Sequence, residues 1–269
     1  MRIKLFIFAT QKNSTLYWAK AHPMKKLLKD VIYFLLSLFR YRGAVVLMYH
    51  SVGDSEEFFT VSEKEFTRQM KYLSEKNFNV IRAKELVEIL ENNLPLPKKT
   101  VVITFDDGYE DNYLTAMPIL KKYNFPAIVF VSTANIGKAT TGVMGTEFKI
   151  ISTDAIKEMD KSGLIDIESH SHEHIKLPSI GGLEVDEQLS ASQRILKGIL
   201  SKDVDLVAYP SGKVNEGVME IAKEYFRAGF GVQKGRVVHG DDIMVLKRNS
   251  VDSKVSLTQF KGISVFGRI

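Results

Sequence analysis

Short apolar segments that stop abruptly at polar residues recur along the chain, and the clearest example lies within residues 100–113. The run Val101–Phe105 is almost uninterruptedly apolar, which is typical of a strand buried on both faces of a parallel sheet or barrel. Two adjacent carboxylates, Asp106 and Asp107, follow it directly, and Gly108 then allows the backbone to turn. An Asp-Gly turn with solvated acids would give the same local pattern. The rest of the chain therefore decides between a simple turn and a functional site.

Strands and helices are predicted to alternate from residue 44 onward. The candidate strands are residues 44–52, 79–81, 101–105, 127–131, 164–168, 204–208, 227–232 and 244–246. The candidate helices are residues 62–76, 83–91, 113–123, 153–161, 184–200 and 217–225, whereas the Gly- and Thr-rich residues 137–145 are expected to form a loop. Roughly seven strand-helix units without an internal repeat predict one barrel-like α/β domain. Polar clusters at successive strand ends are expected where the carboxyl ends of parallel strands build a site.

The first 43 residues differ in composition from the remainder, with many Lys, Arg and bulky apolar residues and a single acidic residue, Asp30. Residues 24–42 carry apolar side chains at roughly helical spacing between cations, which predicts a helix that packs on the domain or lies on a membrane surface. Its apolar part is too short for a membrane span of about 20 residues, and no small-residue cleavage site follows. We therefore divide the chain into a basic, apolar helical extension, residues 1–43, and a catalytic domain, residues 44–269. A membrane-associated or cell-envelope location is expected, on a side that the sequence leaves open.

The overall composition excludes two kinds of site. Without cysteine the chain forms no disulfide and no thiolate metal site, so any metal must be held by His, Asp, Glu or other oxygen ligands. The net charge of +5 is modest, much of the basic excess lies near the start, and no nucleic-acid-binding motif accompanies it. A nucleic-acid partner is therefore not expected.

Three of the six histidines, His170, His172 and His174, fall within five residues directly after a predicted buried strand. On a helical turn His170 and His174 would face one side, and on an extended strand all three would share a face. Either geometry makes a two-histidine site, and Asp107 from a neighbouring strand end would complete a His-His-Asp set with open coordination positions. Such a set favours Zn²⁺ and also accommodates Co²⁺, Ni²⁺ or Mn²⁺. A metal of this kind lowers the pKa of water, and Asp106 beside it would take the proton.

Two segments, Thr104-Phe-Asp-Asp-Gly108 and His170-Ser-His-Glu-His174, resemble the first two signature motifs of the polysaccharide deacetylases, carbohydrate esterase family 4 with its NodB-homology domain. The resemblance extends from about residue 44 to the C-terminus. It implies a distorted (β/α)7 barrel, a divalent metal held by Asp107, His170 and His174, and Asp106 as the base that activates water. As one of the two intervening residues of the second motif, His172 is expected next to the ligands or at the substrate.

The segment Tyr209-Pro-Ser-Gly212 is similar to the third motif of this family. The resemblance implies that the Ser211 amide helps to form an oxyanion hole and that Tyr209 and Pro210 lie at the substrate. Ala208 stands where the family often has an arginine that contacts the catalytic aspartate. Arg248 could supply this guanidinium from another strand end, and a surface arginine is the alternative.

The late histidine motif that usually provides the general acid of the family is absent. His239 lies in a turn-like context and is expected to be a solvated loop residue. In a permuted branch resembling the poly-N-acetylglucosamine deacetylases, the catalytic histidine follows the first strand, and His50 matches that position.

These motifs predict a metal-dependent hydrolase that removes N-acetyl groups from a sugar of a polysaccharide or glycolipid and releases acetate. Its expected partners are an N-acetylated glycan, such as an exopolysaccharide, and a membrane surface through residues 24–42. One alternative is a carbohydrate-binding member of the fold with impaired catalysis, which Ala208 and Ser211 favour. Another is an O-acetyl esterase or an amidase on a different substrate, because a polarised carbonyl and an activated water serve any of these reactions.

Overall fold

The computed structural model describes residues 43–267 of the chain. The chain divides into two units, residues 1–40 and residues 41–269, and all structural statements below concern the described part of the second unit. The helix predicted for residues 24–42 lies outside the described residues. Within the described domain, no helix combines the length and the apolar character needed to cross a membrane.

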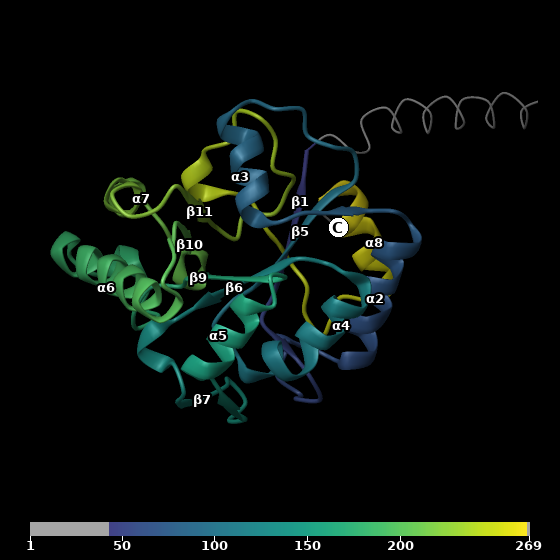
Figure 1. Cartoon of the computed structure of the whole chain (residues 1–269), viewed down its shortest axis with the longest axis horizontal. Helices are drawn as coiled ribbons and strands as arrows, with labels where there is room; N and C mark the ends of the chain where they lie inside the picture. Colours follow the sequence, from purple (N-terminus) through teal and green to yellow (C-terminus); the bar gives the residue numbers. More distant parts are fainter. Residues whose placement is uncertain (1–42, 268–269) are drawn as a thin grey trace, which may run out of the picture. The chain divides into compact units, whose positions relative to one another are not determined.

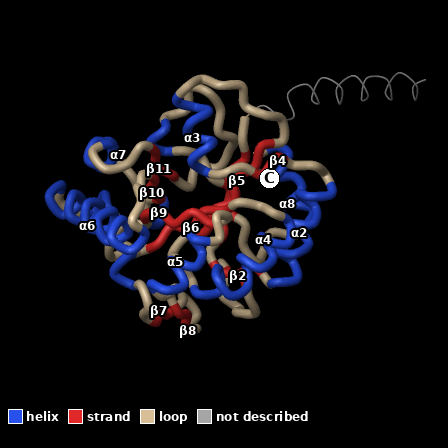
Figure 2. Tube along the Cα trace, in the orientation of Figure 1, coloured by secondary structure: helices blue, strands red, loops and turns tan. Residues whose placement is uncertain are grey.

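A parallel sheet forms the centre of the domain (Figure 2). Seven strands follow one another in the order β11-β10-β9-β6-β5-β1-β12, and β4 pairs with β5 beside this path. The segment that precedes β12 also forms a parallel bridge from Leu246 to Phe230 of β11, so the two ends of the sheet approach each other. The predicted distorted (β/α)7 barrel is therefore confirmed as a curled, incomplete barrel. Its strands are β1 (Val45–Tyr49), β4 (Asn79–Val80), β5 (Thr100–Phe105), β6 (Ala127–Val131), β9 (Ile165–Ser169), β10 (Leu206–Ala208), β11 (Ala228–Phe230) and β12 (Asn249–Ser250).

Helices cover the outer face of the sheet, and Figure 1 shows α2, α4 and α8 grouped on one side and α5, α6 and α7 on the other. Helix α3 differs, because Leu86 and Val87 pack with the side chains of the inner face, such as Val46 and Val102. The helices are α2 (Glu63–Glu75), α3 (Ala83–Glu91), α4 (Met117–Tyr123), α5 (Thr153–Lys161), α6 (Gly182–Leu200), α7 (Glu216–Lys223) and α8 (Leu257–Phe266). The predicted N-cap Ser62 is confirmed, since its side chain accepts a hydrogen bond from the Glu65 amide.

The alternation of side chains along each strand positions the site. In β1 and β5, Val45, Leu47 and Tyr49 and then Val101, Ile103 and Phe105 belong to the outer core beneath the helices. The intervening residues face the inner core, so the next inward positions beyond the strand ends are those of His50 and Asp106. The same alternation in β9 places His170 inward. Three residues far apart in the sequence therefore meet at the carboxyl ends of the strands.

Several predicted elements differ from the observed ones. The predicted loop 137–145 contains a strand, because β7 (Ala139–Thr141) and β8 (Glu147–Lys149) form an antiparallel hairpin. The predicted strand 244–246 is wrong, because the Asp242 side chain accepts a hydrogen bond from the Met244 amide and starts a 3₁₀ turn, Ile243–Val245. The first strand ends at Tyr49 instead of Val52, and β2 (Ser51–Val52) leaves the sheet to pair with β3 (Thr60–Val61). Helix α8 was not predicted.

Candidate active site

A cavity of about 470 Å³ opens at the carboxyl ends of the strands. It is lined by six of the predicted site residues: His50, Asp106, Asp107, His170, His174 and Ser211. Tyr209 and Pro210 are buried and are not among the residues that line it, so their predicted position at the substrate stays a prediction. The main chain turns after Pro210, and only Ser211 and Gly212 of this motif reach the cavity wall.

Asp107, His170 and His174 bring their ligand atoms together within 4.8 Å of one another. Oδ1 of Asp107 lies 3.4 Å from Nε2 of His170 and 3.2 Å from Nε2 of His174. Nδ1 of His170 lies 2.7 Å from the Ala208 carbonyl oxygen, which only accepts hydrogen bonds, so Nδ1 carries the proton and Nε2 presents a lone pair. Oδ1 of Asp107 and the two Nε2 atoms thus converge on one point. This donor set fits a divalent cation of the zinc type.

The ionisation state of Asp107 is compatible with metal binding. Burial alone would raise the pKa of Asp107, but its contacts with His170 and His174 hold that pKa well below its ordinary value. Asp107 is therefore an ionised carboxylate that meets two imidazoles. A cation, or protons on the imidazoles, must balance this charge.

The backbone at the site adopts conformations that L-amino acids rarely take. Asp107 (φ 72°), Ser171 (φ 63°), His174 (φ 60°) and Ser211 (φ 57°) all lie in the left-handed region. Each such residue costs free energy and persists only where its surroundings enforce it, which is common at functional sites. At Ser211 this conformation bends the chain so that residues 211–212 line the cavity wall.

Arg248 holds the other carboxylate, Asp106. Its Nη1 donates to Oδ1 of Asp106 at 2.6 Å and its Nη2 donates to Oδ2 at 2.7 Å. Nε donates to the Gly231 carbonyl at 2.8 Å, and the guanidinium lies 5.7 Å from the centre of the Phe130 ring. The Arg248 side chain is completely buried, so the alternative of a surface arginine is wrong. Arg248 thus supplies the guanidinium expected at the position of Ala208, from 40 positions later in the chain.

Burial alone would raise the pKa of Asp106, but the positive charge and hydrogen bonds of Arg248 lower it below its ordinary value. Asp106 is consequently ionised at neutral pH and fixed in orientation by the two-point contact. The two adjacent aspartates therefore have different surroundings: Asp107 faces the imidazoles, whereas a guanidinium holds Asp106.

The three remaining predicted histidine positions have different surroundings. His50 lines the cavity, and its ring centre lies 6.1 Å from that of Phe59. His172 does not line the cavity, and its Nδ1 lies 2.8 Å from Oγ1 of Thr133. His239 is exposed, as predicted, and lies outside the cavity.

Further cavity residues escaped the sequence analysis. Tyr109 lines the cavity and stacks on Phe59 with the ring centres 5.5 Å apart. Burial, followed by the charge of Asp107, raises the pKa of Tyr109, so its phenol stays protonated. Glu57 is fully buried behind the wall and accepts a hydrogen bond from the Met144 amide at 2.6 Å, which joins the loop before β3 to the β7–β8 hairpin. The polar stretch after Gly108 was the available signal for Tyr109, whereas Glu57 had none.

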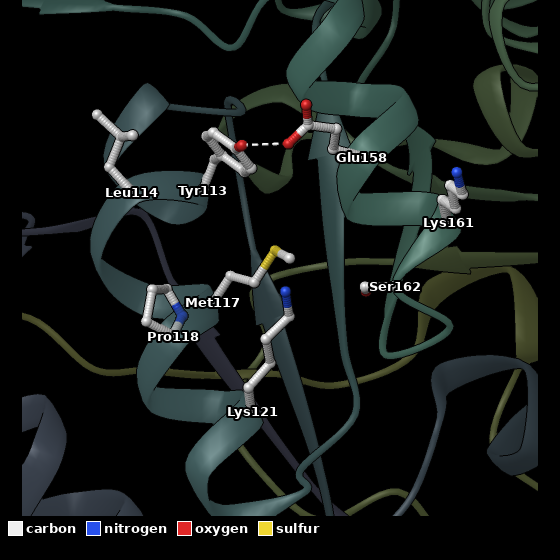
Figure 3. A pocket seen from close by; sticks show the side chains of 8 residues that line it. All are labelled: Tyr113, Leu114, Met117, Pro118, Lys121, Glu158, Lys161 and Ser162. Carbon is white, nitrogen blue, oxygen red and sulfur yellow. Dashed lines mark hydrogen bonds between the residues drawn. The ribbon is translucent and has the colours of Figure 1, made fainter.

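Two other cavities are alternative locations for the active site. A smaller one of about 190 Å³ adjoins the first and shares Asp107 and His174 with it. Another of about 470 Å³ lies between α4 and α5, where the Tyr113 hydroxyl donates to Glu158 (Figure 3). None of the candidate ligands lines the cavity between α4 and α5. The cavity that contains His50 and Asp106 is therefore the candidate active site.

Comparisons with known proteins agree with this geometry. The sequence model of the family described as Polysaccharide deacetylase matches residues 93–227, a segment that contains Asp106, Asp107, His170, His174 and Ser211. YxkH of Bacillus subtilis (strain 168), which carries the same family description in its name, is 29% identical over 216 residues, covering 80% of this chain and 74% of that protein. The Poly-beta-1,6-N-acetyl-D-glucosamine N-deacetylase of Staphylococcus aureus (strain N315) is 29% identical over 188 residues. That match covers 66% of this chain and 63% of the relative, so the chain spans less than two thirds of its length.

Among solved structures, IcaB from Ammonifex degensii superposes with a TM-score of 0.74 at 26% identity, covering 85% of this chain and 98% of that one. The matching segment contains the two aspartates and the two histidines that converge in the cavity. The chain belongs to the polysaccharide deacetylase family.

Proposed function

We propose that this chain is a metal-dependent hydrolase that removes N-acetyl groups from the sugars of an N-acetylated glycan and releases acetate. The observation that carries the proposal is the division of the adjacent carboxylates. Asp107 lies 3.2–3.4 Å from the two imidazole Nε2 atoms, whereas both oxygens of Asp106 accept hydrogen bonds from Arg248. One carboxylate is thus a metal ligand and its neighbour is free to act as a base.

The metal would be held by Asp107, His170 and His174. His-His-Asp ligation suits Zn²⁺ and also accommodates Co²⁺, Ni²⁺ or Mn²⁺. A divalent cation in this place supplies Lewis acidity, which polarises an acetyl carbonyl and lowers the pKa of water. The Ala208 carbonyl, which accepts from Nδ1 of His170, fixes the tautomer and orientation of that ligand.

Asp106 accepts the proton of the water that attacks the acetyl carbon, and Arg248 keeps Asp106 ionised and oriented before the step. The negative charge that develops on the carbonyl oxygen is stabilised in part by the Ser211 amide. His50, from the end of a different strand, donates a proton to the sugar nitrogen as the carbon-nitrogen bond breaks. The products are acetate and a free amino sugar, and the groups return to their starting protonation states after solvent exchange.

The names of the relatives support the substrate class. The Staphylococcus aureus relative is named Poly-beta-1,6-N-acetyl-D-glucosamine N-deacetylase, and the solved structure that superposes on this chain is IcaB. We propose a polymer of N-acetylated hexosamine as the substrate of this chain as well. The cavity of about 470 Å³ lies within the ~300–1,000 Å³ range of small-molecule sites. The alternative of an impaired binding protein rested on Ala208 and Ser211. The two hydrogen bonds from Arg248 to Asp106 supply the guanidinium that is missing at position 208 and argue against this alternative, which the acetate-release test decides.

The test is acetate release by the purified chain from β-1,6- and β-1,4-linked N-acetylglucosamine oligomers and from an O-acetylated glycan, before and after chelation and with single metals restored. Asp106→Asn is expected to abolish turnover and retain bound metal, whereas Asp107→Ala and His174→Ala are expected to lose the metal. His239→Ala is the control, because this histidine is exposed outside the cavity. Full activity of Asp106→Asn would refute the base, and acetate from the O-acetylated glycan alone would make the chain an esterase.

A further inference from the structure

His50 occupies the point where the chain leaves the central sheet. The Tyr49 carbonyl still accepts a hydrogen bond from the Asp106 amide at 2.9 Å, whereas Ser51 and Val52 already pair with β3. Within the described domain the His50 imidazole makes no hydrogen bond to a protein group, and its recorded ring contact is with Phe59. The direction of this imidazole therefore depends on how the backbone of residues 50–52 is held.

Two residues a few positions after the aspartate motif, Asp111 and Asn112, hold this backbone. Nδ2 of Asn112 donates to the His50 carbonyl at 2.7 Å. The Asp111 carboxylate accepts from the Ser51 hydroxyl at 2.6 Å with Oδ2 and from the Val52 amide at 3.2 Å with Oδ1. Each of residues 50–52 thus forms a hydrogen bond with the side chain of Asp111 or Asn112.

The orientation of the Asn112 amide is fixed by its neighbours. Its Nδ2 lies between two acceptors, the His50 carbonyl and Oδ1 of Asp111 at 2.9 Å, so exchanging the amide nitrogen and oxygen would place acceptor against acceptor. As a consequence, Oδ1 of Asn112 is buried without a partner, in a residue that is only 1% exposed. An unpartnered buried acceptor destabilises the folded state, and such exceptions call for an explanation.

The local backbone supports the same interpretation. Asn112 opens a π-helical turn, Asn112–Ala116, before α4 begins. Turns of this kind are rare, and they occur frequently at functional sites. Here the turn presents the Asn112 side chain toward the branch between β1 and β2, as the 2.7 Å contact shows.

We propose that Asn112 and Asp111 are positioning residues of the deacetylation site, which act by fixing the backbone of residues 50–52 and thereby the direction of the His50 imidazole. The inference rests on the proposed role of His50 as proton donor to the departing nitrogen. A proton donor must lie within hydrogen-bonding reach of that nitrogen, and displacing a catalytic group by about 1 Å can cost roughly 100-fold in rate. Neither residue lines the candidate active-site cavity, so we expect their effect to pass through His50.

The first experiment removes the donor of Asn112 at nearly constant volume. Asn112→Leu is expected to lower kcat for acetate release from N-acetylglucosamine oligomers by about 10–100-fold, with KM and metal content close to those of the parent. Gln193→Leu is the matched control, because the Gln193 amide likewise donates two hydrogen bonds, in its case to the backbone carbonyls of Val204 and Tyr225, and does not line the cavity. A parent-like kcat in Asn112→Leu would overturn the proposal.

The second experiment asks whether the effect passes through His50. Adding Asn112→Leu to His50→Ala should cause no further loss, because a group that acts through His50 has nothing left to position. A further loss of the same factor would show a general structural role and refute the proposal. Asn112→Leu should also hydrolyse 4-nitrophenyl acetate at the parent rate, because that leaving group departs without a proton. Asp111→Asn, which keeps the acceptor for Val52, should retain more N-deacetylase activity than Asp111→Leu.

A measurement on the free protein separates this inference from the proposed function. In the ¹⁵N-histidine-labelled chain, Asn112→Leu is expected to shift the imidazole resonances of His50, which His50→Gln identifies by their loss. If the parent released no acetate from any N-acetylated glycan but the shift occurred, the proposed function would fail and the positioning would stand. If the parent were active and Asn112→Leu changed neither the shift nor kcat, the positioning would fail and the proposed function would stand.

Discussion

Replacing Arg248 by methionine is expected to destabilise the domain strongly and to inactivate the base. The Arg248 side chain is completely buried, and its guanidinium makes both hydrogen bonds to Asp106 as well as one to the Gly231 carbonyl. Arg248→Met fills most of the same volume but leaves the Asp106 charge buried without a partner. Breaking one side of a buried ion pair costs about 3–5 kcal/mol, which is a large part of the roughly 5–15 kcal/mol by which domains are stable.

The loss should reverse when the unpaired charge is removed. In the double variant Arg248→Met/Asp106→Asn an uncharged amide replaces the carboxylate, so most of the lost stability is expected to return. Arg248→Lys keeps the charge but gives up the two-point contact, and its stability should lie between those of the parent and Arg248→Met. Arg227→Met is the control, because Arg227 is 45% exposed and its pairs with Glu91 and Asp205 should contribute no more than about 1 kcal/mol.

Urea unfolding followed by far-ultraviolet circular dichroism measures these differences. The reasoning is refuted if Arg248→Met unfolds at the parent midpoint, or if the double variant is no more stable than the single one.

Arg248→Met is also expected to lower kcat and to change its pH dependence. Without the guanidinium, burial raises the pKa of Asp106, so a smaller fraction of the base is ionised at neutral pH. Because only the ionised carboxylate accepts a proton from water, kcat at a given pH should fall in proportion to that fraction. Because the defect is protonation, kcat of the variant should rise with pH over a range where the parent is flat. Unchanged kcat together with an unchanged pH profile would show that Arg248 does not hold the base.

Three further outcomes are expected. Asp107→Asn and His174→Gln should each lower metal content, measured by atomic emission after dialysis, by at least about 10-fold, because each removes one of three protein ligands. Burial raises the pKa of Asp111 to about 6, so protonation of this group increases the free energy of unfolding as the pH falls through that value. Between about pH 7.5 and pH 5, the free energy of unfolding of the parent, measured by urea titration, should rise by about 1.4 kcal/mol relative to that of Asp111→Asn. Glu57→Ala should raise KM more than it lowers kcat, because it releases the hairpin held through the Met144 amide, whereas Glu57→Gln keeps an acceptor and should resemble the parent. Equal KM values for both Glu57 variants and the parent would contradict this account.

Much of the candidate site was predictable because it depends on local patterns. The candidate metal ligands follow from a run of three histidines and from a carboxylate pair, each placed at the end of a buried strand. Strand alternation then brings them to one end of a parallel sheet, where the structure places their ligand atoms within 4.8 Å. The hairpin β7–β8 was missed because its strands have three residues each and, apart from Phe148 of β8, contain only polar or small residues, so the alternation by which a strand is recognised is too short to see.

The amino-acid sequence by itself determined the alternation of strands and helices, the family and the convergence of Asp107, His170 and His174, because apolar periodicity and residue spacing are properties of neighbouring residues. Only the tertiary structure decided what holds Asp106, since Arg248 lies 142 residues away and is brought to it by the segment that joins β11 to β12. It likewise decided that Asn112 contacts the His50 carbonyl across 62 residues. The geometry of these long-range contacts is set by the packing of the whole curled sheet, and local sequence patterns carry no record of it.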